Sequence, residues 1–292
     1  CVELSPSVLA VAHHFSEYNE NVINRQDSRI RITLDDGRNF QFRTKERYDV
    51  ITFEPPPPTA PGVVNLYSKD YYELCKQHLT PDGIVCQWAP LHMFSEPTAR
   101  MVVRSFVEVF PNATLWEGSV DDYLLVGSPG ATKVDKARIL EYARTFEKPL
   151  RQIGIEDGYD MMALFKRGPN ALHSYAATGL TITDNFPHLE YADSLFPPVS
   201  ELRQNDLSQL QSTITGLEEK ELATVFQRSK TLDLLQQFRY AADPAEESIG
   251  FLARYHWARE VQKVYPSSPY VETILEYSPD RLQYFEARAK SD

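Results

Sequence analysis

Strand-like and helix-like segments alternate over the first 130 residues, and this alternation leaves few architectures open to the chain. Amphipathic runs, preceded by helix-capping residues such as Ser5 and Ser68, separate short apolar runs. The strand-like runs are residues 1–4, 30–34, 48–53, 84–90, 113–118 and 122–128. Such alternation is typical of an α/β domain with a doubly wound sheet. The run at 48–53 is more continuously apolar than the run at 30–34, which predicts a central strand.

Polar side chains stand at the ends of four predicted strands. They are Glu3, Asp36, Glu54 and Gln87. Because open α/β sheets bind ligands at the carboxyl ends of their strands, these residues are candidates for a binding site. A carboxylate such as Glu3 can accept two hydroxyl hydrogen bonds from a ribose. Asp36 could accept from an exocyclic amine, and Gly37 would let the backbone approach a base. Taken singly, Glu3 and Asp36 could each be a turn or cap residue, but their order on successive strands favours a site.

Four prolines, Pro55–Pro58, directly follow Glu54. Proline has no backbone N–H and a fixed φ, so this segment can neither extend the sheet nor flex freely. We therefore expect the prolines to hold the Glu54 carboxylate toward a pocket.

Charge and cysteine content exclude several classes of function. The formal net charge is −11 and the pI is near 5.2, which argues against a non-specific nucleic-acid-binding protein and is compatible with a cationic substrate. The three cysteines, Cys1, Cys75 and Cys86, form no CxxC pair, so neither a disulfide framework nor a zinc site is predicted. No apolar run approaches the ~20 residues of a membrane-spanning helix.

The second half of the chain is predicted to be mostly helical. Residues 131–197 are interpreted as a helical extension or lid of an α/β domain that occupies residues 1–197. Asp184, in the segment TDNFPHLE, is expected to be either a capped turn or a lid residue over the pocket. A Pro-rich stretch near residue 198 predicts a boundary, and amphipathic patterns predict a helical C-terminal region over 198–292.

Several motifs carry a resemblance to a known family. They include VELSP, DSRIRITLDDGRNF, YDVITFEPP, LYSKDYYELCKQHLTPDGIVCQW, SFVEVFPNATLW and LTITDNFPHLEY. Together, residues 1 to about 195 resemble the spermidine/spermine synthase family, and most of all its bacterial spermidine-synthase-like domains that are often fused to membrane segments. The resemblance implies a Rossmann-like doubly wound sheet of the class I methyltransferase type, truncated at its N-terminus and followed by a helical appendage.

The resemblance also implies residue roles. Glu3 matches the acid that binds the ribose of decarboxylated S-adenosylmethionine, and Asp36, beside Gly37, matches the acid that meets the adenine amine. Glu54 matches the catalytic acid, which would hold the acceptor amine and help it lose a proton before it attacks the carbon next to the sulfonium. Further substrate-pocket candidates are Tyr67, Gln87, Trp88 and Asp184. The implied co-substrate is decarboxylated S-adenosylmethionine or S-adenosylmethionine, with no metal.

Three departures from the family pattern keep other functions open. Pro57 stands where the family has a second loop acid, residues 120–127 lack its Tyr-Pro-x-Gly stretch, and the chain begins after the expected Gly-rich loop. The leading prediction is a polyamine-synthase-like transferase that moves an aminopropyl group. One alternative is a methyltransferase, suggested by Glu-Pro-Pro at residues 54–56. The other is a non-catalytic binding or interaction domain.

Expectations for partners and location follow from the same resemblance and from the negative charge. We expect a small amine or another small acceptor as substrate, and no nucleic acid. The expected location is cytoplasmic, either free or tethered to a membrane segment outside this sequence, and a homodimer is left open.

Overall fold

The computed structural model covers most of the chain up to residue 241. It describes residues 1–23, 27–56, 62–90, 94–119, 122–130, 134–153, 155–191, 202, 206–241, 259 and 263. The predicted boundary at residue 198 and nearly all of the chain after residue 241 lie outside the described residues, so the predicted domain limits stay predictions.

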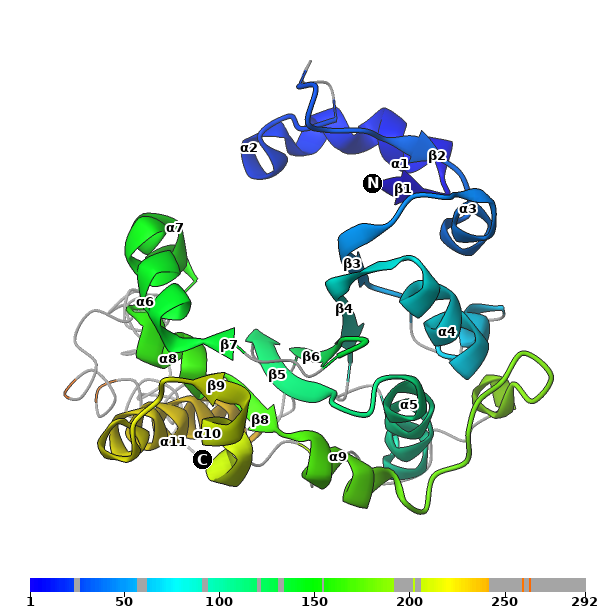
Figure 1. The fold of residues 1–292 in the computed structure, drawn as a ribbon. Helices are drawn as coiled ribbons and strands as arrows, with labels where there is room; N and C mark the ends of the chain where they lie inside the picture. The colour runs from blue at the N-terminus through cyan, green and yellow to red at the C-terminus, as the bar shows by residue number, and fades with distance from the viewer. Residues whose placement is uncertain are drawn as a thin grey trace, which may run out of the picture.

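The centre of the molecule is a five-stranded sheet with the strand order β3-β4-β6-β5-β8 (Figure 1). Its strands are β3 (Tyr48–Phe53), β4 (Leu79–Ala89), β5 (Thr114–Ser119), β6 (Asp122–Gly127) and β8 (Phe165–Arg167). β3 and β4 pair in parallel, with Phe53 beside Gln87, and the remaining pairs are antiparallel. Because helices alternate with these strands along the chain, the predicted α/β class is confirmed.

A second, smaller sheet precedes two of the candidate acids. β1 (Val2–Glu3) pairs in parallel with β2 (Thr33–Leu34). In the described part of the chain, neither strand pairs with the five-stranded sheet. β3 therefore stands at the end of the strand order, and its Val50 is 56% exposed. The prediction that residues 48–53 form a central strand is wrong for the described residues, because β3 has a paired neighbour on one side only.

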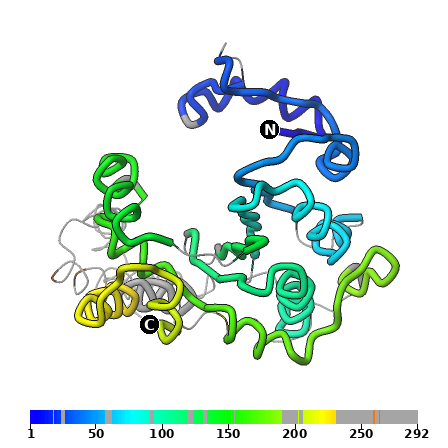
Figure 2. Tube along the Cα trace, in the orientation of Figure 1, coloured from blue at the N-terminus to red at the C-terminus, as the bar shows by residue number. Residues whose placement is uncertain are grey.

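We call residues 1–43 the N-terminal unit. Its described residues form the small sheet and the helical segments α1 (Pro6–Val11), η1 (Ala12–Phe15), α2 (Ser16–Asn19) and α3 (Gly37–Arg43). Figure 2 shows this unit in blue at one end of the molecule, next to β3.

The main hydrophobic core forms where helices pack on the five-stranded sheet. α4 (Lys69–Gln77) and α5 (Glu96–Val109) lie next to each other there (Figure 1). Ser68 caps α4, as predicted, by accepting a hydrogen bond from the backbone N–H of Tyr71 at 3.2 Å. The largest side chains buried in this core include Tyr67, Tyr72, Phe106, Phe110, Leu115 and Leu125. This packing fixes the end of β3, which Glu54 follows, and the last part of β4, which contains Gln87.

A second hydrophobic core lies at the other end of the sheet, beyond β8. The elements of this part are α6 (Lys136–Thr145), α7 (Glu147–Gln152), α8 (Gly158–Ala163), α10 (Leu210–Thr213), α11 (Glu219–Ala241) and the parallel pair β7 (Val134–Asp135) and β9 (Ile214–Thr215). Buried residues from 139 to 165 pack against residues from 210 to 225, so both sides of the predicted boundary contribute to this core. α11 lies in the region after residue 198 that was predicted to be helical.

The remaining described elements connect these parts. They are η2 (Val63–Leu66), α9 (Pro169–Ala176), η4 (His188–Tyr191) and η5 (Leu207–Gln209). α9 packs against α5. Within the described ranges, no helix combines the length and apolarity needed to cross a membrane.

Candidate functional site

A cavity of about 480 Å³ opens between the N-terminal unit and β3. The residues that line it include Cys1, Val2, Thr33 and Gly37 of the N-terminal unit and Ile51 and Phe53 of β3. This volume lies within the range of small-molecule sites, roughly 300–1,000 Å³. Of the residues predicted to bind a nucleoside, Gly37 lines the cavity, whereas Glu3 and Asp36 are not part of its described wall.

Glu3 lies at the end of β1, as predicted, and its carboxylate takes part in a turn. Its Oε1 accepts a hydrogen bond from the backbone N–H of Ser5 at 2.7 Å, just before α1 begins. The side chain is half-buried. The turn interpretation is therefore correct, and a ribose would have to use the lone pairs that this bond leaves.

Asp36 is the N-cap of α3. Its Oδ1 accepts a hydrogen bond from the backbone N–H of Asn39 at 2.8 Å, which confirms the cap interpretation. A side chain at the next residue, Gly37, would begin in open space, because a Cβ there would meet no atom of the described residues within 4 Å. Packing within the chain thus does not require glycine at this position, and the space beside it belongs to the cavity.

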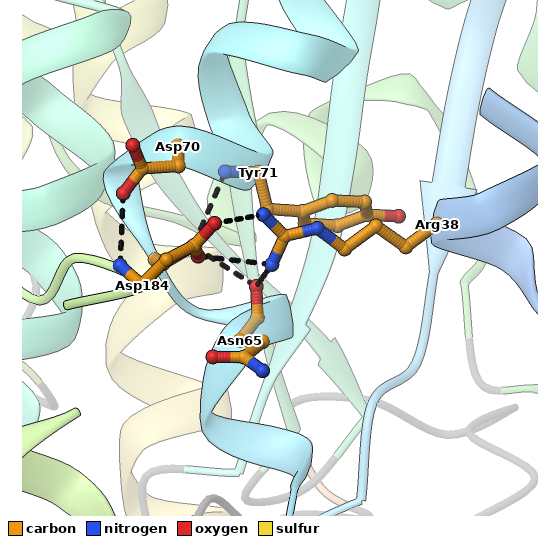
Figure 3. Close-up of polar contacts among 6 residues, drawn as sticks. Arg38, Asn65, Asp70, Tyr71 and Asp184 are labelled. Carbon is orange, nitrogen blue, oxygen red and sulfur yellow. Dashed lines mark hydrogen bonds and ion pairs between the residues drawn. The ribbon is translucent and has the colours of Figure 1, made fainter. Parts of the chain in front are cut away.

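Arg38, the residue after Gly37, forms a bidentate ion pair with Asp184, which lies 146 residues away in the sequence (Figure 3). Nη1 donates to Oδ1 at 3.0 Å and to the carbonyl oxygen of Asn65 at 2.9 Å, and Nη2 pairs with Oδ2. The guanidinium carbon lies 5.8 Å from the centre of the Tyr71 ring, and the Arg38 side chain is only 13% exposed. We call the Arg38–Asp184 pair the clamp.

Asp184 is also bound to the start of α4. Its carboxylate accepts a hydrogen bond from Oγ of Ser68 at 2.8 Å, and its backbone N–H donates to Asp70 at 2.9 Å (Figure 3). Partial burial would raise the pKa of Asp184, but the hydrogen bonds from Arg38 and Ser68 and the charge of Arg38 outweigh burial and lower this pKa. Asp184 is therefore ionised at neutral pH, and its contribution to a substrate pocket stays a prediction.

Glu54 directly follows β3 and is exposed, and the segment after it is fixed by Tyr67. The Tyr67 hydroxyl donates toward the carbonyl oxygens of Pro55 at 3.3 Å and Pro56 at 3.0 Å. Tyr67 is fully buried, and burial raises the pKa of its hydroxyl, so this donor stays protonated at neutral pH. These bonds support the prediction that the segment after β3 is held in place. Residues 57–61 lie outside the described part of the chain.

Gln87 presents buried polar atoms next to this strand end. It lies beside Phe53 in the β3–β4 ladder and is fully buried, and neither of its amide atoms has a hydrogen-bond partner among the described residues. The same holds for the nearby hydroxyl of Tyr72, whose pKa is raised by burial and is lowered in part by the neighbouring Gln87 amide. A buried polar group left in this state costs about 1–3 kcal/mol, so it points to an additional polar partner. Trp88 is half-buried and stands opposite Leu124 of β6.

The predicted site residues fall into three groups rather than one. Glu3, Asp36 and Gly37 belong to the N-terminal unit; Glu54, Tyr67, Gln87 and Trp88 lie at or near the ends of β3 and β4; Asp184 lies beside α4. Arg38 and Tyr72 were not predicted as site residues, and the only signal for Arg38 was its place directly after Gly37. Among the described residues, no three potential metal ligands lie together.

The first part of the chain matches a known protein domain. Residues 1–124 match the spermine/spermidine synthase domain. Over these residues the chain is similar to the spermine/spermidine synthase family. The matched synthase domain includes Glu3, Asp36, Glu54 and Gln87 and ends before Asp184. The resemblance predicted for residues 125 to about 195 lies outside this match.

Relatives of the synthase domain include named transferases. The polyamine aminopropyltransferase of Buchnera aphidicola subsp. Acyrthosiphon pisum is 30% identical over 98 residues, which are 34% of this chain and 34% of that protein. The polyamine aminopropyltransferase of Shigella boydii is 26% identical over 122 residues, 42% of each chain. The chain thus spans between about a third and two fifths of the length of these relatives.

Solved structures similar to this one include a spermidine synthase and a methyltransferase-like protein. The spermidine synthase of Thermotoga maritima aligns with 18% sequence identity and a TM-score of 0.45, over 60% of this chain and 59% of that chain. Human methyltransferase-like protein 13, solved in complex with SAH, aligns with 23% identity and a TM-score of 0.39, over 51% of this chain and 69% of that chain.

Proposed function

We propose that this chain is an aminopropyltransferase-like enzyme in which Glu54 is the acid acting on the acceptor amine. The observation that carries the proposal is the exposed carboxylate of Glu54 at the end of β3, followed by a backbone segment that Tyr67 holds. The match of residues 1–124 to the spermine/spermidine synthase domain supports it, as do relatives named polyamine aminopropyltransferase.

The reaction requires an amine that has lost a proton. The nitrogen lone pair forms a bond to the carbon beside the sulfonium of decarboxylated S-adenosylmethionine. The carbon–sulfur bond breaks, its electron pair stays on sulfur, and methylthioadenosine leaves. Since a protonated amine has no lone pair to attack with, a positioned base must accept the proton, and we assign this step to Glu54. Its negative charge also attracts a cationic amine.

Binding of the donor is assigned to the N-terminal unit. Glu3 uses Oε1 in its turn and Asp36 uses Oδ1 as the helix cap, so each carboxylate keeps an oxygen that can accept a hydrogen bond from a ribose hydroxyl or an adenine amine. The open space at Gly37 lies on the cavity wall, where a planar base could approach the backbone.

Gln87 and Tyr72 are assigned to the acceptor side. Gln87 is paired with Phe53, the last residue of β3, and Glu54 follows Phe53 directly in the chain. The unpaired amide of Gln87 and the unpaired hydroxyl of Tyr72 would gain partners from a polar substrate group. Such pairing would remove the cost of burying them and favour a ligand that carries an amine or ammonium group.

Turnover measurements test the proposal. We would incubate the 292-residue chain with decarboxylated S-adenosylmethionine and a panel of diamines and polyamines, and measure methylthioadenosine. Glu54→Gln should lower kcat by about 10²–10⁴-fold, the usual contribution of a general acid or base. Asp82→Asn, which changes an exposed acid on β4, should leave kcat unchanged. Absence of product with every amine, or unchanged turnover in Glu54→Gln, would overturn the proposal.

A non-catalytic binding domain is the second candidate. It is favoured by the turn and cap bonds that already occupy one oxygen of Glu3 and one of Asp36. Calorimetry that shows no affinity for methylthioadenosine or any other adenosyl nucleoside would support it. Production of S-adenosylhomocysteine from S-adenosylmethionine would instead identify a methyltransferase.

A further inference from the structure

Few described polar contacts join the N-terminal unit to the five-stranded sheet and its helices. Arg31 and Glu46 form one ion pair at 3.3 Å, but their side chains are 74% and 58% exposed, and such surface pairs contribute little to stability. The Cys75 thiol donates a hydrogen bond to Oε1 of Gln41 at 3.5 Å, but a thiol is a weak donor. The clamp is a charged contact of a different kind, because Arg38 is largely buried and bidentate.

The Asp184 end of the clamp is fixed to the main body, by which we mean the five-stranded sheet with helices α4 and α5. Two residues before it, the backbone N–H of Ile182 donates to Oγ of Ser105 at 2.8 Å. The hydroxyl of Thr181 donates to Glu108 at 2.9 Å. Both acceptors lie on α5, and Asp184 itself is bound to the first residues of α4. Asp184 therefore offers Arg38 a carboxylate whose position is set by the two helices that pack on the five-stranded sheet.

The Arg38 end of the clamp lies in the first turn of α3. Asp36 caps this helix and Gly37 begins it, so both precede Arg38 directly in the chain. Glu54 follows β3, which belongs to the main body. The clamp (Figure 3) thus joins α3, whose cap is Asp36, to the part of the molecule whose strand β3 precedes Glu54.

We infer that the Arg38–Asp184 clamp fixes the N-terminal unit, and with it Asp36 and Gly37, at a set distance from Glu54. Arg38 and Asp184 are positioning residues in this view, since they act through the helix that they hold. The catalytic consequence rests on the proposed function, whereas the geometric consequence does not. A planar, bidentate guanidinium is required, so lysine should not replace Arg38.

A distance measurement tests the geometric part. Spin labels would be placed on Cys1, which is exposed beside the small sheet, and on a cysteine introduced by Asp82→Cys at an exposed site of β4, in a chain that also carries Cys86→Ala. Pulsed electron paramagnetic resonance should give one narrow distance distribution. Asp184→Asn and, separately, Arg38→Lys should broaden or shift it.

Lys136→Met is the matched control. It removes another ion pair between residues far apart in sequence, Lys136–Glu221 at 2.8 Å, whose side chains are 18% and 15% exposed and lie in the second core region. The control should leave the distance distribution unchanged. Circular dichroism would confirm that each variant is folded. An unchanged distribution in both clamp variants, or an equal change in Lys136→Met, overturns the inference.

Kinetics test the catalytic part. Misplacing reacting groups by about 1 Å can cost roughly 10²-fold in rate, so we expect Asp184→Asn to lower kcat ten- to a hundredfold while the KM for the amine changes less than threefold. If the unaltered chain shows no turnover with any amine but the clamp variants still change the distance distribution, the transferase proposal fails and the positioning inference stands. If kcat falls without any change in distance, the positioning inference fails.

Discussion

Replacing Tyr72 with phenylalanine is expected to stabilise the protein, although the residue is fully buried. The Tyr72 ring packs edge-on against Phe106, with ring centroids 5.0 Å apart, and the substitution keeps this contact. It removes only the hydroxyl, which makes no hydrogen bond of ordinary geometry among the described residues and has the Gln87 amide as its polar neighbour. Because an unpaired buried hydroxyl costs about 1–3 kcal/mol, Tyr72→Phe should raise the free energy of unfolding by roughly 1 kcal/mol.

Tyr67→Phe provides the matched control. Tyr67 is equally buried, but its hydroxyl donates toward the carbonyl oxygens of Pro55 and Pro56. Its loss should lower the free energy of unfolding by about 1 kcal/mol. Urea denaturation of both variants, compared at equal slope m, gives the two differences with their signs. A loss of stability in Tyr72→Phe as large as that in Tyr67→Phe would refute the conclusion that the Tyr72 hydroxyl is unpaired.

Three further predictions concern other charged or buried groups. Lys166 and Glu117 form an ion pair at 2.9 Å with side chains 0% and 4% exposed, so Lys166→Met should lower the free energy of unfolding in urea by about 3–5 kcal/mol, and an apolar residue at both positions should restore most of it. Because the pKa of Asp184 is lowered in the folded protein, the ionised carboxylate stabilises the fold fully at pH values above the ordinary carboxyl pKa, and this stabilisation is lost as the pH falls through the lowered pKa. The free energy of unfolding, measured against pH, should therefore fall less steeply in acid for Asp184→Asn than for the unaltered chain. Burial raises the pKa of the Cys75 thiol to about 12, so mass spectrometry after iodoacetamide treatment at pH 8 should find the exposed Cys1 alkylated and Cys75 unmodified.

Local patterns in the sequence predicted the elements of this fold well. Ser68 marks the start of α4 because its hydroxyl satisfies a backbone N–H that the helix leaves unpaired. The two strand-like runs at 113–118 and 122–128 form the antiparallel pair β5 and β6, since only a short connection separates them. These features depend on neighbours in the sequence, which is why periodicity and capping residues suffice to find them.

Features that depend on distant residues could not be predicted. The clamp joins Arg38 to a residue 146 positions away, and neither side chain has a spacing or motif that marks the pair. The exposure of Val50 depends on which strands pair with β3, and its apolar sequence alone indicated a buried position. Asp36 shows a different difficulty, because an aspartate before a helix has the same sequence pattern whether it caps the helix or also binds a ligand.

Identification of the nucleoside that this chain forms from decarboxylated S-adenosylmethionine tests the proposed function most directly. Mass spectrometry of the reaction with a diamine such as putrescine should find methylthioadenosine together with the amine lengthened by one aminopropyl group, and both should fall about 10²–10⁴-fold in Glu54→Gln. Intact donor after prolonged incubation with every amine tried, or equal amounts of product from the Glu54→Gln variant, would contradict a transferase that uses Glu54 as its base.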